Sequence, residues 1–242
     1  MKSLQLLLGL SRGQHGVSQS LAIDGVWGAT SSNALASFRQ GMGIAEQGLL
    51  APADVTLDAL RAGLPDGVPA ALLWAVMING SAARIEAFHQ PLLAALERYG
   101  IDTPLRIAHF LAQVAHESGC LRYTEEIANG QAYEGRKDLG NLQPGDGVRF
   151  KGRGLIQLTG RANYRAYGQH CQRDFEADDP AQVSHEPALA VDVAGWFWWR
   201  NGLNEWADQD DLRQVTRRIN GGYNGLDDRA FYLARARWLL RG

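Results

Sequence analysis

Residues 103–119 read TPLRIAHFLAQVAHESG, and this stretch predicts the helix around which the rest of the fold is arranged. Thr103 suits the N-cap, and Pro104 suits the first helical position, where its missing N–H costs nothing. The glycine that closes the stretch, Gly119, ends the helix. One buried stripe is marked by apolar residues at helical spacing: Leu105, Ala108, Leu111, Ala112 and Ala115. The helix therefore delivers Glu117 at its C-terminal end.

Glu117 is the first candidate for chemistry. It follows Ala115 and lies near Phe110 and Leu111, so we expect apolar surroundings. Such surroundings disfavour a charged carboxylate, and a general acid has to hold its proton. The alternative is a surface carboxylate on the polar side of the helix.

Two further acids, Glu125 and Glu126, follow within nine residues of Glu117. On an unbroken helix nine residues turn the chain by about 900°, which would put Glu117 and Glu126 on opposite faces. Because Gly119 breaks the helix, the chain can fold back and bring two carboxylates across a cleft. An inverting glycosidase holds such a pair about 6.5–9.5 Å apart, with room for one water.

Residues 150–160 read FKGRGLIQLTG, and the glycines suggest backbone in close approach to something. Gln157 and Thr159 alternate with Ile156 and Leu158, as in an edge strand, so both polar side chains should point the same way. That pair could hydrogen-bond a sugar or position a water. The alternative is a glycine-rich turn into an edge strand without a ligand. A phosphate loop is excluded, because GxxxxGK[ST] does not occur.

A third polar cluster, RINGGYNG, covers residues 218–225 and predicts a tight turn that offers Asn220 to a ligand. The aromatic run at Trp196, Trp198 and Trp199 favours core packing, with sugar stacking as the alternative. His116-Glu117 is half of a zinc-binding HExxH motif, but position 120 is Cys, so the second His is missing and we do not expect a metal. We expect no organic cofactor either.

The remaining pattern predicts two domains. Residues 1–64 form a small three-helix unit with helices near 4–10, 29–40 and 54–62, around a core of Leu8, Trp27, Leu35, Phe38 and Leu60. Residues 65–69 are a linker rich in Pro and Gly. Residues 70–242 are mostly helical, with a polar loop at 127–150 and late helices that include residues 194–199 and 228–240.

Charge and composition limit the partners. The chain holds 24 Lys and Arg against 26 Asp and Glu, which weighs against nucleic acid as a ligand. From Arg213 onward there are seven Arg and two acids, either a solvated face or a surface attracted to an anionic bacterial envelope. Cys120 and Cys171 are expected to be reduced. No stretch suits a signal peptide or a membrane span, so we expect a protein made in the cytoplasm. We also expect a monomer.

Together these clusters resemble glycoside hydrolase family 19. The matching segments are AHESG at 115–119, then Glu126, GRGLIQLTG at 152–160, Asn163-Tyr164, WFW at 196–198 and INGG at 219–222. The resemblance implies a mainly α, lysozyme-like catalytic domain in which Glu117 is the acid and Glu126 the general base, with Glu125 as an alternative base. Thr159 would hold the attacking water. The implied substrate-binding residues are Gln157, Asn163, Tyr164, Asn220, Arg229 and His116.

Residues 1–64 resemble the small helical peptidoglycan-binding domain. The resemblance rests on the turn from Asp24 to Gly28, with Trp27, and on Phe38 in the following helix; the family's Gln after the Phe is Arg39 here. The two resemblances together imply a modular phage endolysin of a Gram-negative host. Such an enzyme hydrolyses the β-1,4 bonds of peptidoglycan and reaches the periplasm through a membrane pore. The alternatives are a chitinase, a metal-dependent amidase and a catalytically weak wall-binding protein.

Overall fold

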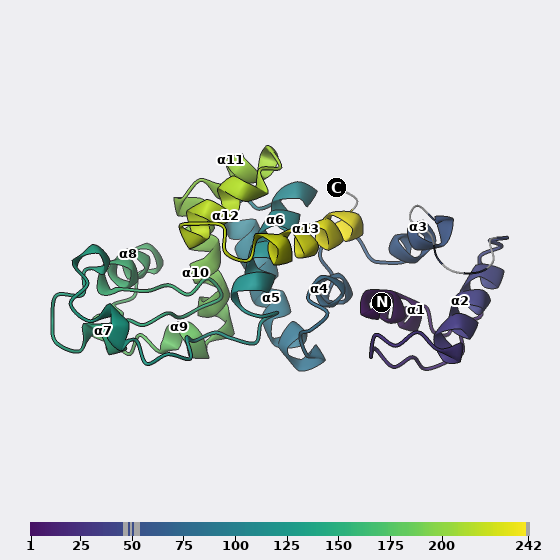
Figure 1. Ribbon diagram of the computed structural model, residues 1–242, viewed down its shortest axis with the longest axis horizontal. Coiled ribbons are helices and arrows are strands. Elements are labelled where there is room, and N and C mark those ends of the chain that lie inside the picture. Colours follow the sequence, from purple (N-terminus) through teal and green to yellow (C-terminus); the bar gives the residue numbers. More distant parts are fainter. Residues whose placement is uncertain (46–47, 49, 51–53, 241–242) are drawn as a thin grey trace. The chain divides into compact units, whose positions relative to one another are not determined.

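The computed structural model describes the whole chain except residues 46–47, 49, 51–53 and 241–242. Helices make up the fold, as predicted, and in the described part of the chain β-structure is limited to isolated bridges. The chain divides into two compact units, Met1–Ile78 and Asn79–Gly242 (Figure 1).

The described residues of the first unit form four helices, of which three were predicted: α1 (Lys2–Leu10), α2 (Ala29–Gly41), α3 (Val55–Ala62) and α4 (Ala70–Val76). Helix α4 packs on α1, and Ser3 Oγ donates to Ala75 O at 3.0 Å. Because this contact ties α4 to α1, the boundary between the units falls at residue 78 rather than in the predicted linker at 65–69.

The core of the first unit follows the sequence prediction with one exception. Leu8, Leu35, Phe38 and Leu60 are all buried. Trp27 was expected to join them but is half-buried, because it lies in the extended turn before α2. The core is therefore aliphatic except for Phe38.

The second unit is built on the predicted helix, α6 (Pro104–Glu117). Thr103 caps it, since its side chain accepts from the N–H of Arg106. Helix α13 (Leu226–Leu240) packs along α6, and α10 (Pro187–Arg200) packs on α5 (Ala82–Arg98) (Figure 1). The other helices are α7 (Asp146–Arg149), α8 (Arg161–Cys171), α9 (Gln182–His185), α11 (Leu203–Asp208) and α12 (Leu212–Asn220).

The predicted loop at 127–150 contains short helical turns: η1 (Gln131–Tyr133), η2 (Lys137–Leu139) and α7. Glu134 accepts from the N–H groups of Gly145 and Gly147 at 2.7 and 2.8 Å, which closes the loop on itself. Asp146, whose side chain is 1% exposed, pairs with Arg161 at the start of α8. These hydrogen bonds and this ion pair hold the loop in a defined conformation that contains no β-strand.

The prediction of an edge strand at residues 156–159 was wrong. Arg153 and Leu158 instead exchange two backbone hydrogen bonds around a turn of four residues. Gln157 in that turn has a φ of +57°, outside the extended range of a strand.

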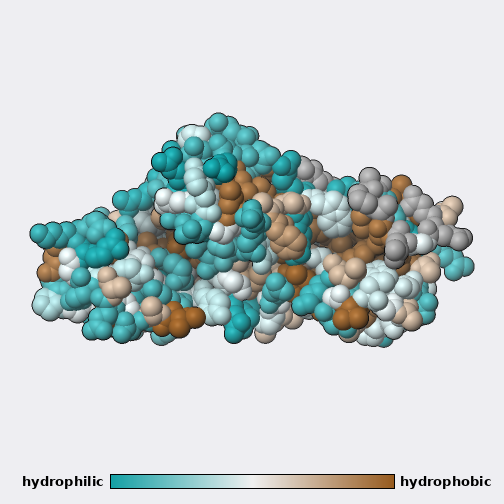
Figure 2. Space-filling model, viewed as in Figure 1, coloured by the Kyte–Doolittle hydropathy of each residue, from teal (hydrophilic) through white to brown (hydrophobic). Residues whose placement is uncertain are grey.

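Of the three tryptophans in α10, Trp196 and Trp198 are buried and Trp199 is 55% exposed. Both cysteines are free thiols. None of the described helices is long and apolar enough to span a membrane. In the second unit, the surface over α11 and α12 is mostly hydrophilic (Figure 2).

Candidate active site

Glu117 lies at the last position of α6, and its side chain is 16% exposed. The surroundings of Glu117 are not only apolar, as expected, because the guanidinium of Arg229 lies against its carboxylate. Arg229 Nη2, from α13, donates to Glu117 Oε1 at 2.5 Å. Glu117 is therefore fixed by a buried guanidinium that the helix pattern did not predict.

Arg229 is completely buried, and each of its guanidinium nitrogens has an acceptor. Nη2 binds Glu117, Nη1 binds the side-chain oxygen of Gln113, and Nε donates to Asn224 O at 3.3 Å. A buried cation is strongly destabilising unless its donors are satisfied. The contacts of Arg229 therefore lock α6, α13 and the loop before α13 into one arrangement.

His116, next to Glu117, contacts the loop between α12 and α13. Its Nδ1 lies 2.7 Å from Asp228 Oδ2. The ring also lies against Gly225, where an added Cβ would stand 2.1 Å from His116 Cε1. His116 therefore fixes the loop between α12 and α13, and a quarter of its side chain stays accessible.

Glu126 lies where the chain segments around residues 126, 152 and 159 meet, apart from the Glu117–Arg229 pair. Its N–H donates to Gly152 O at 2.9 Å, and its Oε2 accepts from the N–H of Gly152 at 3.2 Å. Its Oε1 accepts from the hydroxyl of Tyr133 at 2.9 Å. Burial, and then the hydrogen bond to Glu126, raise the pKa of Tyr133, which keeps the hydroxyl a donor.

Glu125 points to a different set of partners. Its Oε1 accepts from Arg153 Nε at 2.9 Å and lies 3.4 Å from Lys151 Nζ. The side chain of Arg153 is only 7% exposed. Glu125 is thus occupied by a structural ion pair.

Gln157 and Thr159 do lie on one side, as predicted, although no strand carries them. A Cβ built on Gly152 would stand 2.9 Å from Gln157 Oε1, 3.2 Å from Glu126 Oε2 and 3.3 Å from Thr159 Oγ1. Three oxygens from two chain segments, around residue 126 and at residues 157–159, therefore converge beside Gly152. A side chain larger than hydrogen at position 152 would enter this space.

Asn163 and Tyr164 hold the backbone around Gly152 and Thr159 in place. Asn163 Nδ2 donates to Thr159 O at 2.8 Å, and the hydroxyl of Tyr164 donates to Lys151 O at 2.9 Å. Tyr164 is fully buried, so its part is to hold the backbone beside Gly152 rather than to contact a sugar. Asn220, at the end of α12, is exposed before Gly221, whose φ is +76°.

The histidines of α6 have separate partners. His109 Nε2 lies 2.9 Å from Asp210 Oδ1, and burial lowers the pKa of His109. Across the described residues, no group of three or more His, Cys, Asp or Glu side chains is placed to hold a metal ion.

The family model described as chitinase class I, of glycosyl hydrolase family 19, matches residues 102–210. A glycosyl hydrolase family 19 domain-containing protein of Haemophilus influenzae is 32% identical over 176 residues, which cover 60% of this chain and 85% of that protein. The chain belongs to glycoside hydrolase family 19.

The chain is also similar to a plant relative and to two solved structures. An endochitinase of Arabidopsis thaliana is 35% identical over 175 residues, 67% of this chain and 60% of that protein. Chitinase C of Streptomyces griseus shares the fold, with a TM-score of 0.59 and 24% identity over 72% of this chain and 76% of its own. A bacterial family 19 chitinase covers 71% of this chain and 94% of its own at a TM-score of 0.58 and 23% identity.

As a family 19 chain, this protein is a glycoside hydrolase of the chitinase type. The family match contains Glu117, Glu126 and Thr159 but ends before Asn220 and Arg229. Those two residues are tied to the site by the geometry given above.

The sequence reasoning missed two site residues, Gln113 and Tyr133. Gln113 is a fully buried amide one turn before Glu117, and its Nε2 donates to Thr216 Oγ1 at 3.4 Å. A polar residue on the buried side of α6 was the available signal. No local pattern pointed to Tyr133, because its contact with Glu126 depends on the shape of the 127–150 loop.

The first unit carries the residues of the second resemblance. Asp24 Oδ1 accepts from Gln5 Nε2 at 2.9 Å and from the N–H of Val26 at 2.8 Å, and the bond from Gln5 lowers the pKa of Asp24. Asp24 therefore attaches the turn that contains Trp27 to helix α1. Arg39 is buried and binds Asp54 Oδ2 at 2.5 Å, which joins α2 to α3.

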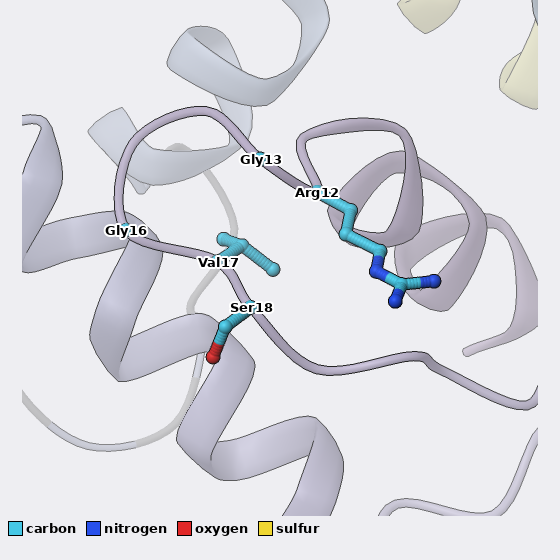
Figure 3. Close-up of a pocket in the computed structure, with 5 residues that line it drawn as sticks. All are labelled: Arg12, Gly13, Gly16, Val17 and Ser18. Carbon is cyan, nitrogen blue, oxygen red and sulfur yellow. The ribbon is translucent and has the colours of Figure 1, made fainter.

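A pocket opens in the loop that follows α1 (Figure 3). It is lined by Arg12, Gly13, Gly16, Val17 and Ser18. Arg12 and Val17 form an isolated bridge, and Gly13 and Gly16 have φ of +79° and +75°, so the loop holds a tight fold of its own. Arg12 is exposed beside this pocket.

Proposed function

We propose that this protein hydrolyses the β-1,4 glycan backbone of bacterial peptidoglycan with inversion, with Glu117 as general acid and Glu126 as general base. The observation that carries the proposal is the contrast between the two carboxylates. One is held by a buried cation at a helix end, and the other shares a small space with Thr159 and Gln157.

The acid step follows from how Glu117 is held. Arg229 occupies Oε1, and within the described residues no donor is bonded to Oε2. Oε2 is thus the oxygen that carries the proton to the glycosidic oxygen. Arg229 fixes the direction of that transfer, which general acid catalysis requires.

The base step follows from the surroundings of Glu126. Tyr133 and the N–H of Gly152 orient its two oxygens, and Thr159 Oγ1 lies on the same side. A water bound between Glu126 and Thr159 would be deprotonated as it attacks the anomeric carbon from the face opposite to Glu117. Glu125 is not the base in this scheme, because Arg153 and Lys151 already engage it.

Peptidoglycan, rather than chitin, is supported by the first unit, whose turn and helices bear the residues that resemble a peptidoglycan-binding domain. In the full proposal the enzyme is an endolysin that reaches the wall through a membrane pore and lyses the host cell. Its first unit holds the wall with the turn at Asp24 to Trp27 and with the Arg12 pocket.

Mass spectrometry of digested peptidoglycan tests the proposal. We expect new reducing ends on the glycan with the wild-type chain and none with Glu117→Gln. Release of free peptides without new reducing ends would identify an amidase instead. Equal cutting by wild type and variant would remove Glu117 from the mechanism.

Chitin is the second candidate substrate, because several relatives are named endochitinases. Turnover of chitin oligomers far above that of purified peptidoglycan would decide for it. Removal of residues 1–78, at the unit boundary, should weaken binding to walls and leave turnover of soluble oligomers unchanged. Unchanged wall binding would contradict the targeting role.

A further inference from the structure

Exposed arginines lie beside the Glu117 end of the site. Residues 212–225 contain three Arg and no acidic residue. Arg213 and Arg217 are four residues apart on α12, so they lie on the same face, and both are exposed.

Arg213 is linked to the acid through Tyr223. Its guanidinium lies 4.3 Å from the centroid of the Tyr223 ring, which is 43% exposed. The next residue, Asn224, gives its carbonyl oxygen to Arg229, and Arg229 holds Glu117. Arg213 is therefore joined to Glu117 by a series of contacts and chain neighbours through Tyr223, Asn224 and Arg229.

A second Arg–Tyr pair follows Glu117 directly in the chain. The guanidinium of Arg122 lies 5.1 Å from the centroid of the Tyr123 ring, which is 37% exposed. The N–H of Tyr123 donates to Ser118 O at 2.8 Å, so this pair is fixed to the residue after the acid. Both chain segments next to Glu117 thus present an arginine stacked on an exposed tyrosine.

These arginines are available to a ligand. In the described part of the chain, no carboxylate oxygen lies within 4.0 Å of the guanidinium of Arg122, Arg213 or Arg217. By contrast, Arg229 and Arg237 of the same basic C-terminal region are paired with Glu117 and Asp210. Arg213 and Arg217 therefore carry positive charge that no carboxylate of the described residues neutralises.

We propose that Arg213 and Arg217, with Arg122 on the adjoining segment, bind carboxylates of the stem peptides that project from the glycan strand in the cleft. The inference rests on the proposed peptidoglycan substrate. A guanidinium presents paired donors that match a carboxylate, and stacking on a ring holds it ready. Chitin is uncharged and offers no such partner. These residues therefore favour peptidized glycan over bare glycan.

The test compares two substrates with the full-length chain: soluble peptidoglycan strands with intact stem peptides, and the same strands after an amidase has removed the peptides. For Arg213→Gln/Arg217→Gln we expect kcat/KM to fall about fivefold to twentyfold on intact strands at low salt, and to stay within about twofold on bare strands. Added salt should shrink the difference between wild type and variant, because it screens exposed charges.

Arg200→Gln is the matched control. Arg200 is also exposed and also lies on an aromatic ring, 5.0 Å from that of Trp196, but in α10. It should leave the ratio of the two activities unchanged. An equal loss on both substrates by the double variant, or an equal change of the ratio by Arg200→Gln, would overturn the inference.

Two other outcomes separate the proposals. If the wild-type chain cuts chitin oligomers but neither kind of strand, the proposed function itself fails. If the double variant is impaired only on cells with an intact outer membrane, the arginines serve the cell surface and the stem-peptide inference is wrong.

Discussion

The two proposed catalytic carboxylates are held in opposite ways. Glu117 is the end of a regular helix, and its partner is a cation buried between α6 and α13. Glu126 lies in irregular chain, and neutral groups, the Tyr133 hydroxyl and the Gly152 N–H, fix it. We call the part of the site around Glu117, α6 and α13 the helical wall, and the part around Glu126, Gly152 and Thr159 the loop wall. The helical wall is held by a buried ion pair, whereas the loop wall is held by its turn and needs the absence of a side chain at residue 152.

The difference teaches which kind of change each wall tolerates. A buried ion pair fails when one partner is removed, because the other charge is left unpaired. A turn with converging side chains fails when its space is filled. The predictions below test each wall by the change to which it should be most sensitive.

Glu117→Gln should have the largest effect. It keeps the shape but removes the transferable proton, so kcat should fall about 10³-fold or more on natural glycan. The far-UV circular dichroism should be unchanged, because the Gln side-chain oxygen can still accept from Arg229, but the free energy of unfolding should fall because the buried guanidinium loses its counter-charge. Residual activity above about a tenth of wild type would show that another group protonates the leaving oxygen.

Glu126→Gln should lower kcat by about 10²–10³-fold, since the attacking water loses its base. Glu125→Gln is the matched control on the neighbouring residue. It should change turnover less than about threefold and lower the free energy of unfolding by about 1 kcal/mol, because it weakens the contacts with Arg153 and Lys151. The reverse ranking in steady-state kinetics would make Glu125 the base.

Gly152→Ala should lower kcat about tenfold while leaving stability close to wild type. Its Cβ would meet the side-chain oxygens of Gln157, Glu126 and Thr159 at 2.9–3.3 Å, which displaces catalytic groups rather than core atoms. Gly225→Ala is the contrasting variant in the helical wall. Its φ is +70° and its Cβ would stand 2.1 Å from His116, so the free energy of unfolding should fall by about 2–4 kcal/mol.

Denaturant unfolding and kinetics on both glycine variants check this pair. A large loss of stability in Gly152→Ala with unchanged kcat in the surviving folded fraction would contradict the assignment of that space to the reaction.

The smallest effect is expected at Glu176, between α8 and α9. Hydrogen bonds from Arg165, then from Arg161, lower the pKa of Glu176 to about 2. Because the folded pKa lies below the ordinary Glu value of 4.5, the carboxylate stabilises the fold above pH 4.5, and this stabilisation is lost as the pH falls towards 2. Glu176→Gln should cost about 1 kcal/mol at pH 7 and flatten that slope without changing kcat. Parallel stability curves for the two proteins would contradict this.

The sequence predicted the helical wall well because its signals are local. Thr103, Pro104 and Gly119 bound α6 without help from the rest of the chain, and the apolar stripe marked its buried side. The contact between Arg229 and Glu117 could not be predicted from local sequence, because the two residues are 112 positions apart. Its role came only from the resemblance.

The loop wall was predicted less well. Gln157 and Thr159 were placed on one side for the wrong reason, because a tight turn, not a strand, brings them together. Tyr133 was missed because nothing near it in sequence reveals that the 127–150 loop folds back on Glu126. Trp27 was misplaced because an aromatic residue before a helix can pack either into the core or along the turn.

A substrate with an activated leaving group tests the central claim most directly. A 2,4-dinitrophenyl oligosaccharide needs no protonation to depart, so its cleavage depends on the base but not on the acid. Measured by release of dinitrophenolate, Glu117→Gln should recover to within about tenfold of wild type, whereas Glu126→Gln should remain about 10²-fold or more impaired. Recovery by Glu126→Gln with none by Glu117→Gln would reverse the two roles and contradict the account.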